Sequence, residues 1–149
     1  MRAVGLDLGE RRIGVAVSDR AGTVAVGHGV VERTADWQAL VAVIAELEPE
    51  RVIVGLPLSL DGTRGPAAQR AEADAAALRR LLDVPVELVD ERFSTVTAHR
   101  GLQAAGARRP DRRRVVDQAA ATILLQSWLD RQRAAPAAPA SRGPGMEPA

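Results

Sequence analysis

The chain has 149 residues, enough for one domain that buries about two-thirds of its unfolded surface around a single core. It contains no cysteine, which excludes disulfide bonds and thiolate metal sites, and no apolar run approaches the length that spans a membrane. All 20 basic residues are arginines and the formal net charge is +1, so the overall charge does not select a partner. The N-terminus lacks a signal-peptide pattern, and we therefore expect a cytoplasmic protein.

The first predicted element is a β-hairpin over residues 4–19, because two alternating apolar runs flank a short polar turn. On its first strand Asp7 lies on the face opposite the large apolar residues, between Gly5 and Gly9. Glycines strip this face of side chains, which weakens a core but lets a metal ion or a phosphate approach the carboxylate. The alternative is an edge hairpin in which a nearby arginine holds Asp7.

A third strand is expected at residues 23–31, where it completes an antiparallel meander. A helix should follow, because Trp37 begins a set of apolar residues at helical spacing. Thr34 or Asp36 is the expected N-cap, and Pro49 lies just past the expected end. We expect Trp37 to be a core residue rather than a platform for a ligand.

The middle of the chain alternates strands and helices. Residues 51–55 form a nearly continuous apolar run, typical of a central strand, and the glycine-rich loop at 55–65 either covers a site or is a plain surface excursion. Pro66 begins a helix with an apolar inner face, and residues 84–89 form a fifth strand. This order predicts an α/β fold with a five-stranded mixed sheet, in which a three-strand antiparallel meander joins two parallel strands, and with helices on both faces.

Two more helices are predicted, one from Ser94 to about residue 105, and a long one that starts at residue 111 or 112 and ends near 133. Residues 134–149 hold prolines and small residues but almost no large apolar ones, so this tail should be disordered. The folded domain is therefore expected to span residues 1–133.

Asp117 is an acidic residue on the inner face of the last helix. It shares that face with Ala121, Leu124 and Trp128, which follow it at helical spacing. It lies too far into the helix to serve the free N–H groups at the helix start. A metal ion or a buried arginine would account for it, and the presence of Asp7 favours the metal.

Glu91 is a third carboxylate, placed at the end of the fifth strand, whereas Asp90 should point the other way. Ligands of open sheets gather beyond the carboxyl ends of strands, where both Asp7 and Glu91 lie. Three carboxylates without cysteine suit Mg²⁺ or Mn²⁺, and two such ions could hold a phosphodiester and an attacking water in line. The lone His28 and His99 are expected to be structural or surface residues.

Arginines gather at residues 108–114, just ahead of Asp117, and form either a solvated turn or a phosphate clamp. With two tryptophans, one phenylalanine and no tyrosine, stacking platforms for bases are scarce. Contacts with nucleic acid should therefore follow its backbone and shape. The residues expected to hold phosphates are Arg12, Arg92, Arg112, Arg113 and Arg114.

Four motifs occur in order across residues 2–130: Gly5-x-Asp7-x-Gly9 with the Arg12-to-Asp19 strand, Val54-Gly55-x-Pro57, Asp90-Glu91-Arg92-x-Ser94-Thr95, and Asp117-x-x-Ala120-Ala121-x-x-Leu124-x-Gln126. Together they resemble the YqgF or RuvX family, a Holliday-junction-resolvase-like group with an RNase H-like fold. The resemblance implies a metal-dependent nuclease, related to the RuvC resolvases, that trims the 5′ end of the small-subunit ribosomal RNA precursor in bacteria. The acidic residues of the family map onto Asp7, Glu91 and Asp117.

One position departs from the resolvase pattern. RuvC-type resolvases have a fourth carboxylate three residues after the acid of the last helix, where this chain has Ala120. Either three acids suffice, or Asp19 or Asp90 serves as the fourth. The expected substrate is structured RNA or branched DNA, with ribosomal precursor particles as partners, no membrane association, and a monomer or homodimer as the active form.

Two other classes of function remain open at this stage. The ATPases of the actin, sugar-kinase and Hsp70 class also begin with a GxDxG phosphate loop on a related fold, but they need a second domain that 149 residues do not supply. A non-catalytic nucleic-acid or ribosome-assembly binding protein could keep the same fold. The three acids argue against that second alternative.

Overall fold

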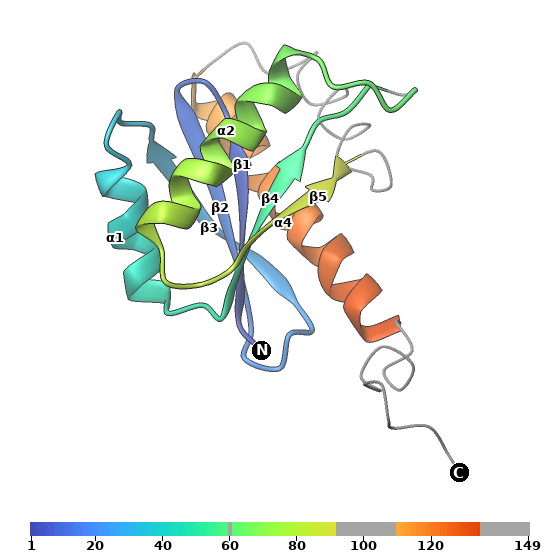
Figure 1. The fold of residues 1–149 in the computed structure, drawn as a ribbon. Coiled ribbons are helices and arrows are strands. Elements are labelled where there is room, and N and C mark those ends of the chain that lie inside the picture. Colours follow the sequence, from blue (N-terminus) through green and yellow to red (C-terminus); the bar gives the residue numbers. More distant parts are fainter. Residues whose placement is uncertain (60, 92–109, 135–149) are drawn as a thin grey trace, which may run out of the picture.

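The computed structural model describes residues 1–59, 61–91 and 110–134, without the side chains of residues 110–117 (Figure 1). The five strands are β1 (Ala3–Leu8), β2 (Arg12–Ser18), β3 (Ala25–Glu32), β4 (Arg51–Leu56) and β5 (Val86–Asp90). The described helices are α1 (Gln38–Leu47), α2 (Pro66–Leu81) and α4 (Pro110–Ala134). None of the helices in these ranges is long and apolar enough to cross a membrane.

The strands form one mixed sheet in the order β3-β2-β1-β4-β5. The β1–β2 and β2–β3 pairs are antiparallel, whereas β1–β4 and β4–β5 are parallel. The predicted combination of a three-strand meander with two parallel strands is therefore confirmed. Because β4 lies between β1 and β5, it brings the carboxyl ends of three parallel strands to one edge of the sheet.

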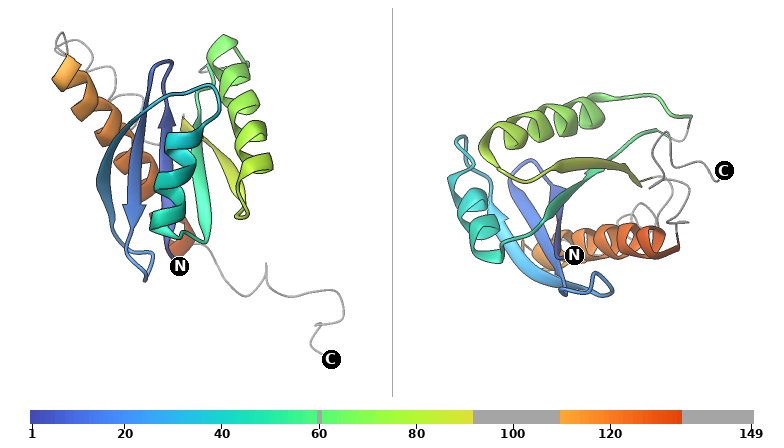
Figure 2. Two further views of the ribbon diagram at one scale, coloured as in Figure 1. Left: turned by 90° about the vertical axis from the view of Figure 1, so that its left-hand side faces the viewer. Right: turned by 60° about the horizontal axis from the view of Figure 1, so that its bottom comes forward.

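The sheet is covered on both faces, as the sequence predicted (Figure 2). On one face α1 and α2 pack over a core of large aliphatic residues from the sheet, including Val4 and Leu6. On the other face α4 packs over smaller sheet residues, including Ala3 and Ala16, and covers them with Leu124, Leu125 and Trp128. Because strand residues alternate, Asp7 belongs to the face that α4 covers.

Gly5 sets how closely α4 approaches the sheet. A Cβ atom at Gly5 would lie 2.8 Å from Leu125 Cβ and 3.2 Å from the carbonyl oxygen of Ala121. Real Cβ atoms do not approach other side-chain atoms so closely, so this position requires glycine for the helix to sit where it does. The helix is thus fixed against β1 two residues before Asp7.

Strand β3 begins at Ala25 and not at Thr23, so that expected start is wrong. The cause is Asp19, whose Oδ1 accepts hydrogen bonds from the backbone N–H groups of Thr23 (2.7 Å) and Val24 (3.1 Å). These bonds hold both residues in the turn after β2, a common role for a short acidic side chain. Strand β5 likewise begins at Val86, two residues later than predicted.

Helix α1 begins at Gln38, and its N-cap is Trp37, so the expected N-cap at Thr34 or Asp36 is wrong. Trp37 takes a left-handed conformation with φ of 61° and makes no side-chain capping bond. Asp36 still supplies one bond, since its Oδ1 accepts from the backbone N–H of Gln38 at 3.1 Å. The side chain of Trp37 is buried, as expected, and the guanidinium of Arg33 lies 4.6 Å from its ring centre.

The remaining boundaries agree with the sequence to within a residue or two. Helix α1 ends at Leu47, just before Pro49, and α2 begins at Pro66 and buries Ala71, Ala75 and Leu78 of its predicted inner face. Helix α4 starts at Pro110 and ends at Ala134. The predicted helix at 94–105 lies outside the described residues, as does the predicted tail at 134–149 apart from Ala134, which ends α4.

Candidate active site

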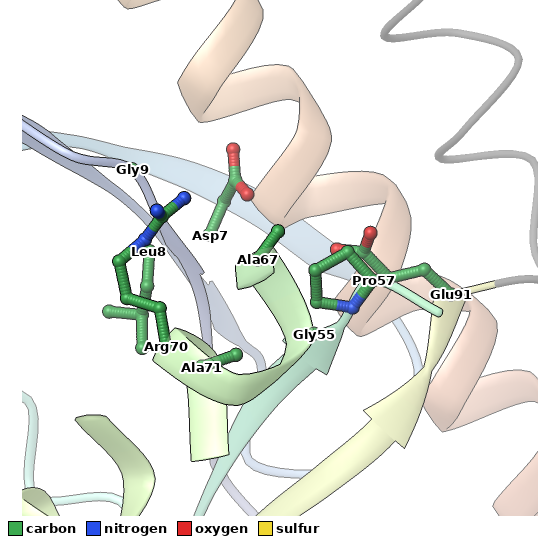
Figure 3. A pocket seen from close by; sticks show the side chains of 9 residues that line it. All are labelled: Asp7, Leu8, Gly9, Gly55, Pro57, Ala67, Arg70, Ala71 and Glu91. Atoms are coloured by element: carbon green, nitrogen blue, oxygen red, sulfur yellow. The ribbon is translucent and has the colours of Figure 1, made fainter. Parts of the chain in front are cut away.

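A cavity of about 230 Å³ opens beyond the carboxyl ends of β1 and β4, beside the first turns of α2 (Figure 3). This is the edge of the sheet at which the carboxylates were expected to meet. The residues that line it are Asp7, Leu8, Gly9, Gly55, Pro57, Ala67, Arg70, Ala71 and Glu91.

Asp7 lies near the end of β1, where it pairs with Gly14 of β2. Asp7 is half-buried. Neither Gly14 nor Gly9 carries a side chain, and Asp7 lines the cavity. The structure thus places Asp7 as the alternation of the hairpin predicted, on the face opposite the large apolar residues and in the lining of the cavity.

Glu91 follows β5 directly and is only 3% exposed, which is unusual for a carboxylate. Its side chain lies across Gly55 of β4, and a Cβ atom at Gly55 would overlap the Glu91 carboxylate. Gly55 is therefore what gives Glu91 room to lie in the cavity. The sequence motif contained this glycine, but its role depends on β4 lying next to β5 and was not predicted.

Asp7 and Glu91 therefore line one cavity, whereas the third expected acid is placed only by its backbone. Asp117 lies in α4 one helical turn before Ala121, the residue whose carbonyl oxygen faces Gly5. Its side chain lies outside the described part of the structure. Among the described residues, no group of three His, Cys, Asp or Glu side chains could hold a metal ion.

Neither of the two candidates for a fourth acid lines the cavity. Asp19 lies in the turn after β2, at the opposite end of the hairpin from Asp7. Hydrogen bonds from the backbone N–H groups of Thr23 and Val24 lower the pKa of its carboxyl. Asp90 is the last residue of β5 and pairs with Leu56, but it does not line the cavity. Asp19 is too remote to act with Asp7, and Asp90 lies beside the site rather than in it.

Arg70 is a cavity residue that the sequence did not single out. It lies on α2, and its Nη1 atom is 3.4 Å from Oε1 of Glu10, at the tip of the β1–β2 hairpin. A single arginine on a polar helix face carries no signal of its own, because most such residues are solvated. Only the packing of α2 against β4 and β5 brings it to the cavity.

None of the arginines predicted to hold phosphates is among the described residues that line this cavity. Arg12 is half-buried at the start of β2 and does not line the cavity. Arg92 lies outside the described residues, as do the side chains of Arg112, Arg113 and Arg114.

A second arginine fixes the loop that follows Asp7. Arg33 donates from Nη2 to Oδ1 of the buried Asp74 at 2.6 Å, and from Nη1 to the carbonyl oxygen of Gly9 at 3.1 Å. The backbone N–H of Gly9 also donates to the carbonyl oxygen of Arg12 at 3.0 Å. Helix α2 and the hairpin tip are thus joined through one guanidinium, which limits the movement of the cavity wall.

Comparison with known families gives a match along nearly the whole described chain. A family model described as RuvX, Holliday junction resolvase, matches residues 1–131. The chain belongs to the RuvX family. A relative from Myxococcus xanthus (strain DK1622), provisionally named a pre-16S rRNA nuclease, is 50% identical over 136 residues, which cover 89% of this chain and 90% of the relative. A relative of the same name from Mycobacterium sp. (strain KMS) is 46% identical over 149 residues, with 97% and 88% covered.

Solved structures of resolvases share the fold of this RuvX chain. T. thermophilus RuvC, in complex with a Holliday junction substrate, has a TM-score of 0.51 at 17% identity and covers 90% of this chain and 96% of its own. Fowlpox virus resolvase, in complex with Holliday junction DNA, has a TM-score of 0.54 at 13% identity and covers 89% and 99%. The predicted RNase H-like fold is confirmed, and at these identities the likeness extends to the fold alone.

Proposed function

We propose that this RuvX chain is a metal-dependent nuclease that hydrolyses phosphodiester bonds in RNA, with Asp7, Glu91 and Asp117 as its metal ligands. The observation that carries the proposal is the meeting of Asp7 and Glu91 in one cavity, although Asp7 lies on β1 and Glu91 follows β5. Membership of the RuvX family and the nuclease names of its relatives support the same class of reaction.

The donor set fits a divalent cation. Glu91 is almost fully buried, and a buried carboxylate is costly unless a cation or strong hydrogen bonds compensate its charge. Its ligand atoms and those of Asp7 are hard oxygens, which suit Mg²⁺ or Mn²⁺. The empty side-chain position at Gly55 leaves space for that carboxylate at the cavity wall.

In the proposed reaction the protein positions the substrate. When bound, divalent ions would lower the pKa of a water molecule and stabilise negative charge on the phosphate. Asp7 would hold the ions from β1 and Glu91 from the end of β5, and the fixed loop at Gly9 would keep their spacing. Such preorganisation is the main contribution of a protein to phosphoryl transfer.

We propose the ribosomal RNA precursor as substrate, because the named relatives are called pre-16S rRNA nucleases. Its 5′ end would be trimmed on ribosomal precursor particles in the cytoplasm. Arg12, Arg92 and the arginines at 112–114 would hold phosphates along the strand. A Holliday junction is the second candidate, since the family description names a Holliday junction resolvase.

The deciding experiment offers precursor 16S rRNA and a four-way DNA junction side by side, with Mn²⁺ or Mg²⁺, to the wild type and to Asp7→Asn. Cleavage of the RNA by the wild type alone supports the proposal. Symmetric cleavage of the junction, with intact RNA, supports a dimeric resolvase instead.

Thermal denaturation in metal-free buffer tests whether Asp7 has a structural role. Asp7→Asn should keep its stability or gain some, because it removes charge repulsion from the empty site. A large loss of stability would favour a structural ion pair. No cleavage of either substrate by the wild type would favour a non-catalytic binder, and tight ATP binding would favour the nucleotide-binding alternative.

A further inference from the structure

Arg70 places a positive charge in the wall of the cavity that holds the two acids. It lies in the second turn of α2 and shares one side of that helix with Ala67 and Ala71, which also line the cavity. Among the described residues that line the cavity, Arg70 is the only base, and Asp7 and Glu91 are the only acids. Figure 3 shows the three side chains bordering the same space from three different elements.

The ion pair between Arg70 and Glu10 is weak. Its Nη1 atom is 3.4 Å from Oε1 of Glu10, and the two side chains are 43% and 75% exposed. Ion pairs between side chains as exposed as these contribute little to stability, because water screens the charges. Exchange of Glu10 for another anion would therefore cost the fold little.

Neighbouring arginines are held more firmly. Arg33 contacts the buried carboxylate of Asp74 at 2.6 Å. Arg64 contacts Glu72 through two guanidinium nitrogens, at 2.7 and 2.8 Å. Of these three side chains, Arg70 combines the longest ion-pair distance with a place in the cavity wall.

We propose that Arg70 leaves Glu10 and binds a non-bridging oxygen of a backbone phosphate when a nucleic-acid strand enters the cavity. This inference rests on the proposed nuclease function. The guanidinium fork matches the oxygens of a phosphate, and its charge offsets the repulsion between that phosphate and the two carboxylates. Because the contact is to the nucleic-acid backbone, it strengthens the binding of RNA and DNA alike. Glu10 is then the ion-pair partner of Arg70 only in the free protein.

The test measures binding in the Asp7→Asn background, so that no substrate is cut. Labelled single-stranded RNA and DNA of one sequence are titrated by fluorescence anisotropy at several salt concentrations. Arg70→Gln should weaken both affinities about tenfold. It should also make the log–log dependence on salt shallower by about 0.7, the slope that one phosphate contact contributes on a single strand. Arg70→Lys keeps the charge and should restore part of the affinity.

Two matched variants separate the contact from its alternatives. Glu10→Gln removes the partner of Arg70 and should bind nucleic acid at least as tightly as the parent. Arg80→Gln removes the same charge from the exposed last turn of α2, away from the cavity, and should have a much smaller effect. Equal losses in Arg70→Gln and Glu10→Gln would mean that the pair is a structural brace, and equal losses in Arg70→Gln and Arg80→Gln would mean a general charge effect. Either result overturns the inference.

Cleavage by the otherwise unchanged protein with Mn²⁺ distinguishes this inference from the function on which it rests. If the wild type cuts RNA and Arg70→Gln binds like its parent, the assignment of Arg70 fails and the nuclease function remains. If the wild type cuts nothing and Arg70→Gln binds weakly, the nuclease function fails and Arg70 remains a phosphate-binding residue.

Discussion

Replacing Gly55 by alanine should move the Glu91 carboxylate without unfolding the protein. An added Cβ atom would overlap the carboxylate oxygen and would lie 3.0 Å from Glu91 Cδ and 3.1 Å from Cγ, against the 3.4–4 Å of ordinary contacts. The end of a glutamate side chain can rotate away, at a cost of about 0.5–1.5 kcal/mol if it leaves its preferred rotamer. Alanine also restricts the unfolded chain, which stabilises the native state by about 0.4–1 kcal/mol. The two terms nearly cancel, so the free energy of unfolding should change by less than about 1 kcal/mol.

Activity should respond far more strongly than stability. The carboxylate has to move by about 1 Å to reach normal contact distance, and a misplacement of that size in an active site costs on the order of 10²-fold in rate. We expect kcat for RNA cleavage with Mn²⁺ to fall by about that factor in Gly55→Ala, with thermal denaturation nearly unchanged. Gly65→Ala is the matched control, because no atom lies within 4 Å of its added Cβ and its φ of −81° suits alanine.

A double-mutant cycle assigns the loss to Glu91. If Gly55→Ala acts through this carboxylate, then Glu91→Gln should remove at least as much activity, and the double variant should lose little more than Glu91→Gln alone. Full activity in Gly55→Ala would refute the argument that the position of Glu91 matters. A loss of several kcal/mol in stability would show instead that the backbone of β4 gives way.

Two further predictions follow from contacts elsewhere in the fold, and a third from the composition of the tail. Gly5→Ala should destabilise the protein by about 1–3 kcal/mol in urea denaturation, because its Cβ would meet Leu125 and the backbone of α4; an unchanged midpoint would contradict the close packing. Asp74→Asn should cost about 1–3 kcal/mol by leaving the partly buried Arg33 without its carboxylate, and unchanged stability would mean that this pair contributes nothing. A chain that ends at Ala134 should fold and cut RNA like the full chain, and a clear drop in substrate affinity would identify residues 135–149 as a binding arm.

The sheet could be predicted from sequence because each strand carries its own signal. The alternation around Asp7 and the apolar run of β4 are local patterns, and both survive in the structure. The start of β3 was misplaced because an acidic side chain held two residues in the preceding turn. The left-handed Trp37 broke the N-cap rule, since a buried aromatic ring is not where a helix usually begins.

The site could be predicted only in part, for a physical reason. Asp7 lies near the end of β1 and Glu91 directly follows β5, and the rule for parallel strands is enough to bring them to one edge. The space that Gly55 provides depends on its register opposite Val89 of β5, and the place of Arg70 depends on the packing of α2 against β4 and β5. Such contacts between distant segments leave no periodic signal in either segment alone.

The arrangement of the sheet means that the cavity exists only when all three parallel strands are paired. Asp7 lies on β1, Glu91 directly follows β5, and β4 lies between these two strands. In the sheet Gly5 of β1 pairs with Ile53 of β4, and Gly55 of β4 pairs with Val89 of β5. Each parallel pairing needs a crossover through α1 or α2, so the meeting of the two acids depends on both crossovers. A substitution that weakens a crossover helix away from the cavity should therefore lower the active fraction while leaving kcat per folded molecule unchanged. Gly55→Ala should instead lower kcat per folded molecule and leave the active fraction unchanged. Active-site titration, run beside thermal denaturation, distinguishes the two effects.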